Sequence, residues 1–192
     1  MGGLYIITKR ALAPPVDFEV SVASNPDDGF GSPDGWYGGS STAYIQLGKS
    51  GLPIRICFFR FDNVLIPANS TILSAKMRVY AYSSSTVTLN LVMHVDKTSN
   101  SVTPTDYTDL DSRPLTSGTN WQITDPWTNA FAYYTSDFSV EIQELIDGVV
   151  WSSGNAMTVI VKNAIGNTTT RSLRHYPVGL PARLIVQYRP PN

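Results

Sequence analysis

The segment from Phe58 to Tyr82 constrains the possible folds of this chain more than any other. It contains the end of one strand, a short turn with Ile66-Pro67, and a second strand in which apolar residues alternate from Ile72 onward. A period of two places successive side chains on opposite faces of a sheet. The segment therefore predicts two strands of an antiparallel β-protein, joined by a turn.

Similar alternating segments recur along the chain, and we expect strands over residues 16–22, 43–48, 54–62, 72–82, 86–95, 157–162, 170–176 and 183–189. Residues 72–82 and 86–95 are predicted to form a hairpin across Ser83–Ser85. Ser139 is predicted to begin a helix that Gly148 limits, with its apolar face formed by Ile142, Leu145, Ile146 and Val149. The sequence thus predicts an all-β protein, an antiparallel jelly-roll β-sandwich with one short helix.

Two regions lack a clear period and are expected to be loops, residues 25–41 and residues 98–134. The first is rich in turn-forming residues, and the second is the longest irregular stretch of the chain. Loops of such length in a compact domain usually carry function or contacts. Candidate binding residues are therefore expected mainly in these two regions.

A length of 192 residues suits one β-sandwich domain, which we place at residues 15–192. Residues 1–14 are predicted to form a separate arm, because Pro14-Pro15 is not compatible with a central strand. The arm is apolar at Leu4, Tyr5, Ile6 and Ile7, which are costly to leave in water. Two alternatives remain open at this point, a frayed terminus or an arm that docks on a partner.

Composition and charge exclude several functional classes. The formal net charge is −1 without a stripe of Lys and Arg, which argues against nucleic-acid binding. No apolar run approaches the length of a membrane span, and the N-terminal segment lacks the pattern of a signal peptide. We therefore expect a soluble protein made inside the cell, complete from Met1 to the closing strand. The single Cys57 is interpreted as an ordinary strand residue.

Catalytic chemistry is poorly supported by the residue pattern. The two histidines, His94 and His175, are expected to be exposed or capped strand residues, and no G-x-S-x-G motif is present. The loop acids are explained more simply by turn formation than by paired catalytic carboxylates. We predict a protein that is not an enzyme. Calcium is the one cofactor considered, with Asp27, Asp28 and Asp34 as possible ligands, because hard cations prefer loop oxygens.

Aromatic residues in or beside the predicted loops are the remaining candidates, namely Trp36, Tyr37, Trp121, Trp127, Phe131, Tyr133 and Tyr134. Three interpretations stay open for them. They cover the edge of the core, they anchor a protein interface, or they form stacking platforms for a glycan, for which Trp36, Tyr37, Trp121 and Trp127 are the candidates.

Three motifs in order carry a resemblance to a known family: Asp27-Asp28-Gly29-Phe30, then Arg60-Phe61-Asp62 with Ile66-Pro67, Ile72 and Ala75, then Gln143–Ile146 with Trp151–Ala156. Together they resemble the DNRLRE and disaggregatase-related β-sandwich domains, which are similar to carbohydrate-binding jelly rolls. In this pattern the guanidinium group of Arg60 is expected to form a bidentate contact with the carboxylate of Asp62 or of a loop aspartate, and so to fix the turn.

The resemblance implies a function as well as a fold. Domains of this group occur as appendages of secreted polysaccharide enzymes and as freestanding virion proteins of tailed phages. The lack of a signal peptide favours the second setting, so we expect a virion protein made in the host cytoplasm. A head decoration or cement subunit, or a tail accessory protein, would contact capsid or other virion proteins as a homo-oligomer. The alternative is a carbohydrate-binding or receptor-binding component that recognises polysaccharide.

Overall fold

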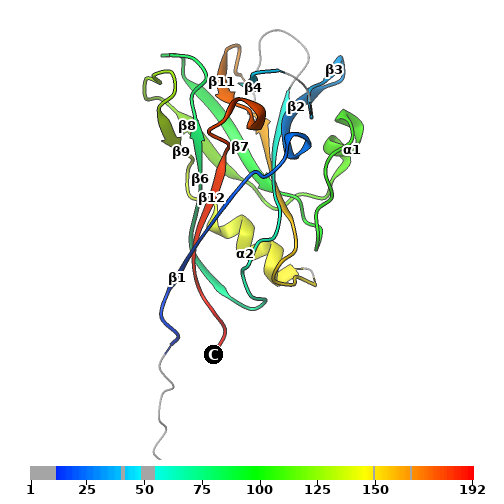
Figure 1. The fold of residues 1–192 in the computed structure, drawn as a ribbon, viewed down its shortest axis with the longest axis vertical. Helices are drawn as coiled ribbons and strands as arrows, with labels where there is room; N and C mark the ends of the chain where they lie inside the picture. The colour runs from blue at the N-terminus through cyan, green and yellow to red at the C-terminus, as the bar shows by residue number, and fades with distance from the viewer. Residues whose placement is uncertain (1–11, 40–41, 49–54, 149, 165) are drawn as a thin grey trace, which may run out of the picture.

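A computed structural model describes residues 12–39, 42–48, 55–148, 150–164 and 166–192. Two antiparallel sheets pack face to face, as Figure 1 shows. The first has the order β1 (Val16–Ser21), β12 (Arg183–Arg189), β6 (Thr71–Tyr80) and β9 (Ala132–Tyr134). The second has the order β3 (Gly35–Trp36), β2 (Asp28–Ser32), β5 (Ile56–Phe61), β10 (Met157–Asn163), β7 (Leu89–Val95) and β8 (Thr119–Ile123). A two-stranded sheet of β11 (Thr170–Arg174) and β4 (Tyr44–Gly48) lies at the upper end.

The predicted all-β sandwich is confirmed. Alternate residues of the strands point into one continuous core, among them Phe59, Met77, Leu91 and Val186, each almost fully buried. The helix predicted from Ser139 is also present as α2 (Ser139–Gly148) and lies across the lower part of the sandwich (Figure 1). Its predicted apolar residues Ile142, Leu145 and Ile146 belong to the core, whereas Val149 lies outside the described residues.

The predicted hairpin of residues 72–82 and 86–95 is wrong. β6 pairs with β12 and β9 in one sheet, whereas β7 pairs with β10 and β8 in the other. The chain between them crosses from sheet to sheet and forms isolated bridges at Ala81 and Ser85 on the way. Period-two alternation predicts that each strand has an apolar face. It does not distinguish two strands paired in one sheet from two strands in opposite sheets whose apolar faces meet in the core.

The six-stranded sheet is buried on parts of both faces. On its outer face Ile56, Phe58 and Ile160 form a second, smaller core with Leu110. Leu110 comes from α1 (Tyr107–Ser112), a helix that the sequence patterns did not predict. Burial on both faces explains why the sequence from Ile56 to Phe59 is apolar at every position rather than alternating.

Both regions predicted to be loops contain regular structure, and the prediction is wrong to that extent. Residues 25–41 include the short 3₁₀ helix η1 (Asn25–Asp27), β2 and β3, and residues 98–134 include α1, β8 and β9. A further 3₁₀ turn, η2 (Tyr176–Val178), follows β11. These elements are short, and β2 contains two glycines, so their sequences give little periodic signal. No helix in the described ranges is long and apolar enough to cross a membrane.

The molecule narrows at the end where β1 begins and the C-terminus lies (Figure 1). The backbone N–H of Ala13 donates a hydrogen bond to Oδ1 of Asn192, at 3.1 Å, and so holds the two ends of the described chain together. We call this region the tapered end. It exposes Leu12, Val16 and Leu65, whose exposed fractions are 68%, 38% and 51%. Leu65 belongs here because its carbonyl accepts from Tyr188, the residue paired with Val16.

Candidate functional site

Arg60 has the structural role that the sequence predicted. Its guanidinium Nη1 lies 3.0 Å from the Asp27 carboxylate and its Nη2 lies 3.3 Å from that of Asp62. Its Nε also donates to the carbonyl oxygen of Ser101, at 2.8 Å, and Thr103 donates to Asp27 at 2.9 Å. Arg60 therefore joins β5, the start of β2 and the segment that leads to α1.

A second buried network fixes that segment. Nη1 of Arg113, directly after α1, lies 3.0 Å from Oδ2 of Asp96, and both side chains are nearly inaccessible. The Ser101 hydroxyl donates to the same carboxylate at 2.6 Å, and Arg113 also lies 3.0 Å from Asp109. The sequence patterns did not identify this network, because its members are scattered over residues 96–113 without a regular spacing. Its effect is to hold α1 firmly on the outer face of the six-stranded sheet.

Asp28 and His175 form a buried pair. Nε2 of His175 lies 2.8 Å from Oδ1 of Asp28, and both side chains have no exposed surface. The other ring nitrogen, Nδ1, lies 3.1 Å from the carbonyl oxygen of Thr42. The expectation of an exposed or capped strand histidine is therefore wrong for His175, which lies inside the protein just after β11. His94 is half-buried and its Nδ1 lies 2.9 Å from the carbonyl of Thr116, as expected for a capped residue.

The three candidate calcium ligands have separate positions. Asp27 pairs with Arg60, Asp28 pairs with His175, and Asp34 is exposed in the turn between β2 and β3. Within the described ranges, no three His, Cys, Asp or Glu side chains lie close enough together to hold a metal ion. The carboxylates of the two consecutive aspartates therefore each have a partner side chain within the protein, Arg60 for Asp27 and His175 for Asp28.

Trp121 and Trp127 are core residues, each only 3% exposed. Tyr133 stacks on Trp127 at 5.1 Å between ring centroids, and the guanidinium carbon of the buried Arg171 lies 4.8 Å from the centre of the same indole ring. For these two tryptophans the structure supports the interpretation that they cover the core. Phe131 and Tyr134, by contrast, are exposed near the end of β9.

Trp36 and Tyr37 are at the surface. Trp36 is half-buried and stacks on Phe58 with the two rings almost parallel, at 2° and 5.3 Å between centroids. Tyr37 stacks on Phe30, at 4.6 Å, and keeps 39% of its surface exposed. Of the four predicted platform residues, these two alone have accessible ring surface.

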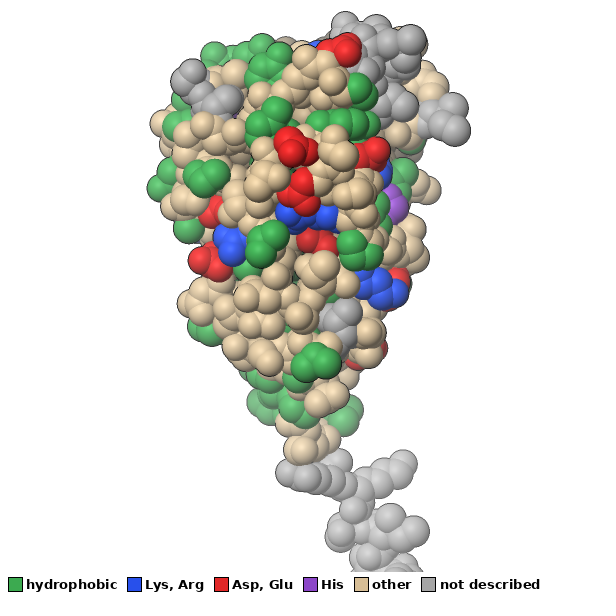
Figure 2. Space-filling model, turned by 90° about the vertical axis from the view of Figure 1, so that its right-hand side faces the viewer, with side chains coloured by type: hydrophobic (Ala, Val, Ile, Leu, Met, Phe, Trp, Pro, Cys, Tyr) green, Lys and Arg blue, Asp and Glu red, His purple; other side chains and the backbone are tan. Residues whose placement is uncertain are grey.

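A groove runs beside Trp36 on the face that carries β3 and α1. It has a volume of about 510 Å³ and is lined by Ser32, Pro33, Asp34, Gly35, Trp36, Asp106, Tyr107 and Thr108. Figure 2 views this side of the molecule, where acidic side chains lie among hydrophobic ones in the upper half. We call it the Trp36–Tyr107 groove. The sequence identified Trp36 and Asp34 but not Tyr107, which the topology brings to them from a distant part of the chain.

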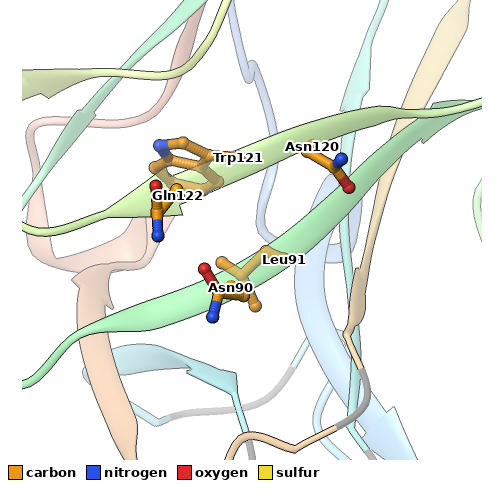
Figure 3. Close-up of a pocket in the computed structure, with 5 residues that line it drawn as sticks. All are labelled: Asn90, Leu91, Asn120, Trp121 and Gln122. Atoms are coloured by element: carbon orange, nitrogen blue, oxygen red, sulfur yellow. The ribbon is translucent and has the colours of Figure 1, made fainter.

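A second depression, of about 300 Å³, lies over β7 and β8 and is lined by Asn90, Leu91, Asn120, Trp121 and Gln122 (Figure 3). Asn90 is paired directly with Gln122, so their side chains share the outer face of the sheet. Asn120, two residues from Gln122, shares that face as well. None of the three amide side chains bonds to another described residue. We call these three residues the amide patch, a surface that is polar but uncharged.

The predicted interface residues Leu4, Tyr5, Ile6 and Ile7 lie outside the described residues, as does most of the predicted arm. Comparison of the chain with protein-family models finds no match, and comparison with curated proteins finds none either. The resemblance to DNRLRE-type domains therefore stays a prediction. Among the described residues, the tapered end, the Trp36–Tyr107 groove and the amide patch are candidate surfaces for binding another molecule.

Proposed function

We propose that this chain is a non-enzymatic structural protein of a tailed-phage virion, a head decoration or cement subunit or a tail accessory protein. It acts through protein–protein contacts with capsid or other virion proteins and assembles as a homo-oligomer. The sequence resemblance supports the virion setting. The observation that carries a contact function is the tapered end, where exposed apolar side chains gather at the point from which the predicted arm leaves the domain.

Exposed apolar surface of this kind is costly in water and is typical of a surface that a partner covers. Figure 2 shows hydrophobic side chains gathered at the narrow lower end of the molecule. A groove beside them is lined by Leu12, Ala13, Asn69, Thr71 and the last four residues, Arg189–Asn192. The apolar residues predicted for the arm, Leu4 to Ile7, would extend this surface and increase the area buried against a neighbour.

The experiment purifies virions from a lysate of the strain that encodes the chain and measures by quantitative mass spectrometry how many copies each particle carries. We expect the protein to co-purify with particles, and deletion of residues 1–14 to remove it from them while the isolated domain stays folded. Leu12→Asp with Leu65→Asp tests the tapered end, with an expected loss of occupancy of at least about tenfold. Val102→Asp is the matched control. Val102 is 69% exposed but is not part of the tapered end, so we expect its substitution to leave the number of copies per particle unchanged. A wild-type protein that remains free of particles would refute the proposal.

A polysaccharide-binding component is the second candidate, and the amide patch favours it. Carboxamide groups both donate and accept hydrogen bonds, which suits a ligand rich in hydroxyl groups and free of charge. A glycan array tests this function directly. Binding that disappears in the Asn90→Ala/Gln122→Ala variant, by a protein that does not associate with particles, would favour this candidate over the first.

A further inference from the structure

The Trp36–Tyr107 groove has a rigid aromatic wall. One face of the Trp36 indole ring is packed on Phe58, so its opposite face is directed away from the sheet. This close packing depends on Gly31, the cross-strand partner of Trp36: a Cβ atom there would lie 2.7 Å from Cε3 of the indole. The ring therefore lies flat over β2, and the glycine beneath it sets its position.

Tyr107, the second aromatic residue of the lining, is also held in place. Tyr107 is the first residue of α1, and the Asp106 carboxylate before it caps the helix by accepting from the backbone N–H of Asp109, at 2.9 Å. The other end of α1 is anchored by Arg113 in its buried ion pair with Asp96. Both aromatic walls thus belong to ordered elements, and a ligand would find the groove already formed.

The charge in the groove has one sign. Its lining includes the carboxylates of Asp34 and Asp106 but no Lys or Arg. The nearby acids Asp109 and Asp111 are neutralised by Arg113 and Lys162, whereas Asp34 and Asp106 have no ion pair with any residue in the described ranges. Burial, and the Asp111 carboxylate beside its hydroxyl, raise the pKa of Tyr107.

We propose that the Trp36–Tyr107 groove binds a lysine or arginine side chain of a partner protein. This proposal rests on the proposed contact function and assigns a second contact surface to it. A cation is attracted to the face of an indole ring more strongly than to other aromatic rings. The flanking carboxylates accept charge-assisted hydrogen bonds from the same group. Arginine and tryptophan are also the residues most enriched among the energetically dominant contacts of protein interfaces.

The test uses two short peptides and the full chain. Acetyl-Gly-Arg-Gly-amide is titrated into ¹⁵N-labelled protein, and acetyl-Gly-citrulline-Gly-amide serves as its neutral isostere. We expect chemical-shift changes at the Trp36 indole and at Tyr107 with the arginine peptide, and binding at least about tenfold weaker with citrulline. Raising the salt concentration from about 0.05 M to about 0.5 M should also weaken binding of the arginine peptide.

Two variants locate the binding to the groove. Trp36→Leu keeps an apolar cover over Phe58 but removes the π face. Asp34→Asn/Asp106→Asn removes both charges, and asparagine at position 106 still caps α1. Each is expected to weaken arginine-peptide binding by about tenfold or more, whereas Asp17→Asn on β1, in the other sheet, should leave it unchanged.

Equal binding of the two peptides, unchanged binding by the double variant, or binding of neutral cellotetraose at Trp36 in place of the peptide would each overturn the proposal. Particle occupancy distinguishes failure of the groove proposal from failure of the proposed virion function. If wild-type protein and the double variant occupy particles equally, the groove proposal fails and the virion function stands. If the wild type binds the arginine peptide at Trp36 but never associates with particles, the groove proposal is supported and the virion function is refuted.

Discussion

Nε2 of His175 lies 2.8 Å from Oδ1 of Asp28, inside the protein and 147 residues away in the sequence. The same nitrogen is 3.0 Å from the carbonyl oxygen of Asp28, and Nδ1 faces the carbonyl of Thr42. A neutral imidazole has a single N–H and can satisfy only one of these two sides, whereas the imidazolium satisfies both. The geometry therefore favours a charged histidine paired with a buried carboxylate.

The first prediction concerns the pH dependence of this pair. Burial alone would lower the pKa of His175, but the hydrogen bond and charge of Asp28 outweigh it and raise the pKa above 6.5. A raised folded-state pKa gives a stabilising contribution that is complete below 6.5 and is lost as the pH rises through the folded-state value. We expect the free energy of unfolding, measured by urea denaturation, to fall over this alkaline range.

Asp28→Asn provides the comparison. It removes one partner of a buried pair and should lower the free energy of unfolding at pH 6 by about 3 kcal/mol. It should also flatten the pH profile above 6.5, and the double variant Asp28→Asn/His175→Gln should cost less than the sum of the two single variants. A stability difference between wild type and Asp28→Asn that widens as the pH rises from about 6.5 to about 9 would contradict this account.

The second prediction concerns the ion pair of Arg113 and Asp96. Arg113→Met leaves the Asp96 carboxylate buried without its counter-charge, and we expect a loss of about 3–5 kcal/mol in the free energy of unfolding. Lys162→Met is the matched control, since Lys162 pairs with Asp111 at the surface and should contribute no more than about 1 kcal/mol. Equal losses in the two variants, measured by denaturant titration, would argue against a special role for the buried network.

A third prediction concerns the support of Trp36. Gly31→Ala places a methyl group 2.7 Å from Cε3 of the indole, closer than such atoms approach one another, so the ring must move off Phe58. We expect a loss of about 1–3 kcal/mol in stability, together with a changed near-ultraviolet circular dichroism spectrum. Gly148→Ala is the control, because its added methyl group meets only the flexible Lys97 side chain. An unchanged spectrum in Gly31→Ala would show that the stack does not depend on the glycine.

The sequence predicted most long strands correctly because each of them has a self-contained period. β12, for example, alternates buried Leu184 and Val186 with less buried neighbours, and this pattern is visible without knowledge of its partners. β8 also alternates, with Trp121 and Ile123 inside and Asn120 and Gln122 outside, so its sequence did contain the signal of a strand. The six residues of α1 are too few for helical periodicity to emerge, and the Asp106 cap was its main local signal.

The candidate site was less accessible to sequence reasoning. Trp36 and Tyr107 become neighbours because β3 pairs with β2 at a sheet edge and α1 folds back onto the same face. Neither event has a local signal in the sequence. Arg60 was identified correctly because the strand end and a nearby acid, Asp62, lie two residues apart. His175 was placed wrongly because its partner Asp28 is remote, and only the fold brings the two together.

The last prediction concerns Glu144 on α2, which ties the helix to the segment before β8. Its Oε1 lies 2.8 Å from Nζ of Lys97, and its Oε2 accepts from the backbone N–H of Ser117, also at 2.8 Å. The hydrogen bond with Lys97, followed by that with Ser117, lowers the pKa of Glu144 from 4.5 to about 2. A lowered folded-state pKa stabilises the protein above the unfolded value, and this contribution is lost as the pH falls from 4.5 toward 2.

The side-chain carboxyl of Glu144 can be followed by ¹³C NMR during an acid titration. We expect a midpoint near 2 in the wild type and a midpoint closer to 4.5 in Lys97→Met, because the methionine removes the larger cause of the shift. The stability difference between wild type and Glu144→Gln should narrow over the same acid range. A wild-type midpoint near 4.5 would mean that the Lys97 contact does not persist in solution. The link between this part of the chain and α2 would then depend on Thr119. Its hydroxyl donates a hydrogen bond to the carboxylate of Glu141, a buried residue of α2.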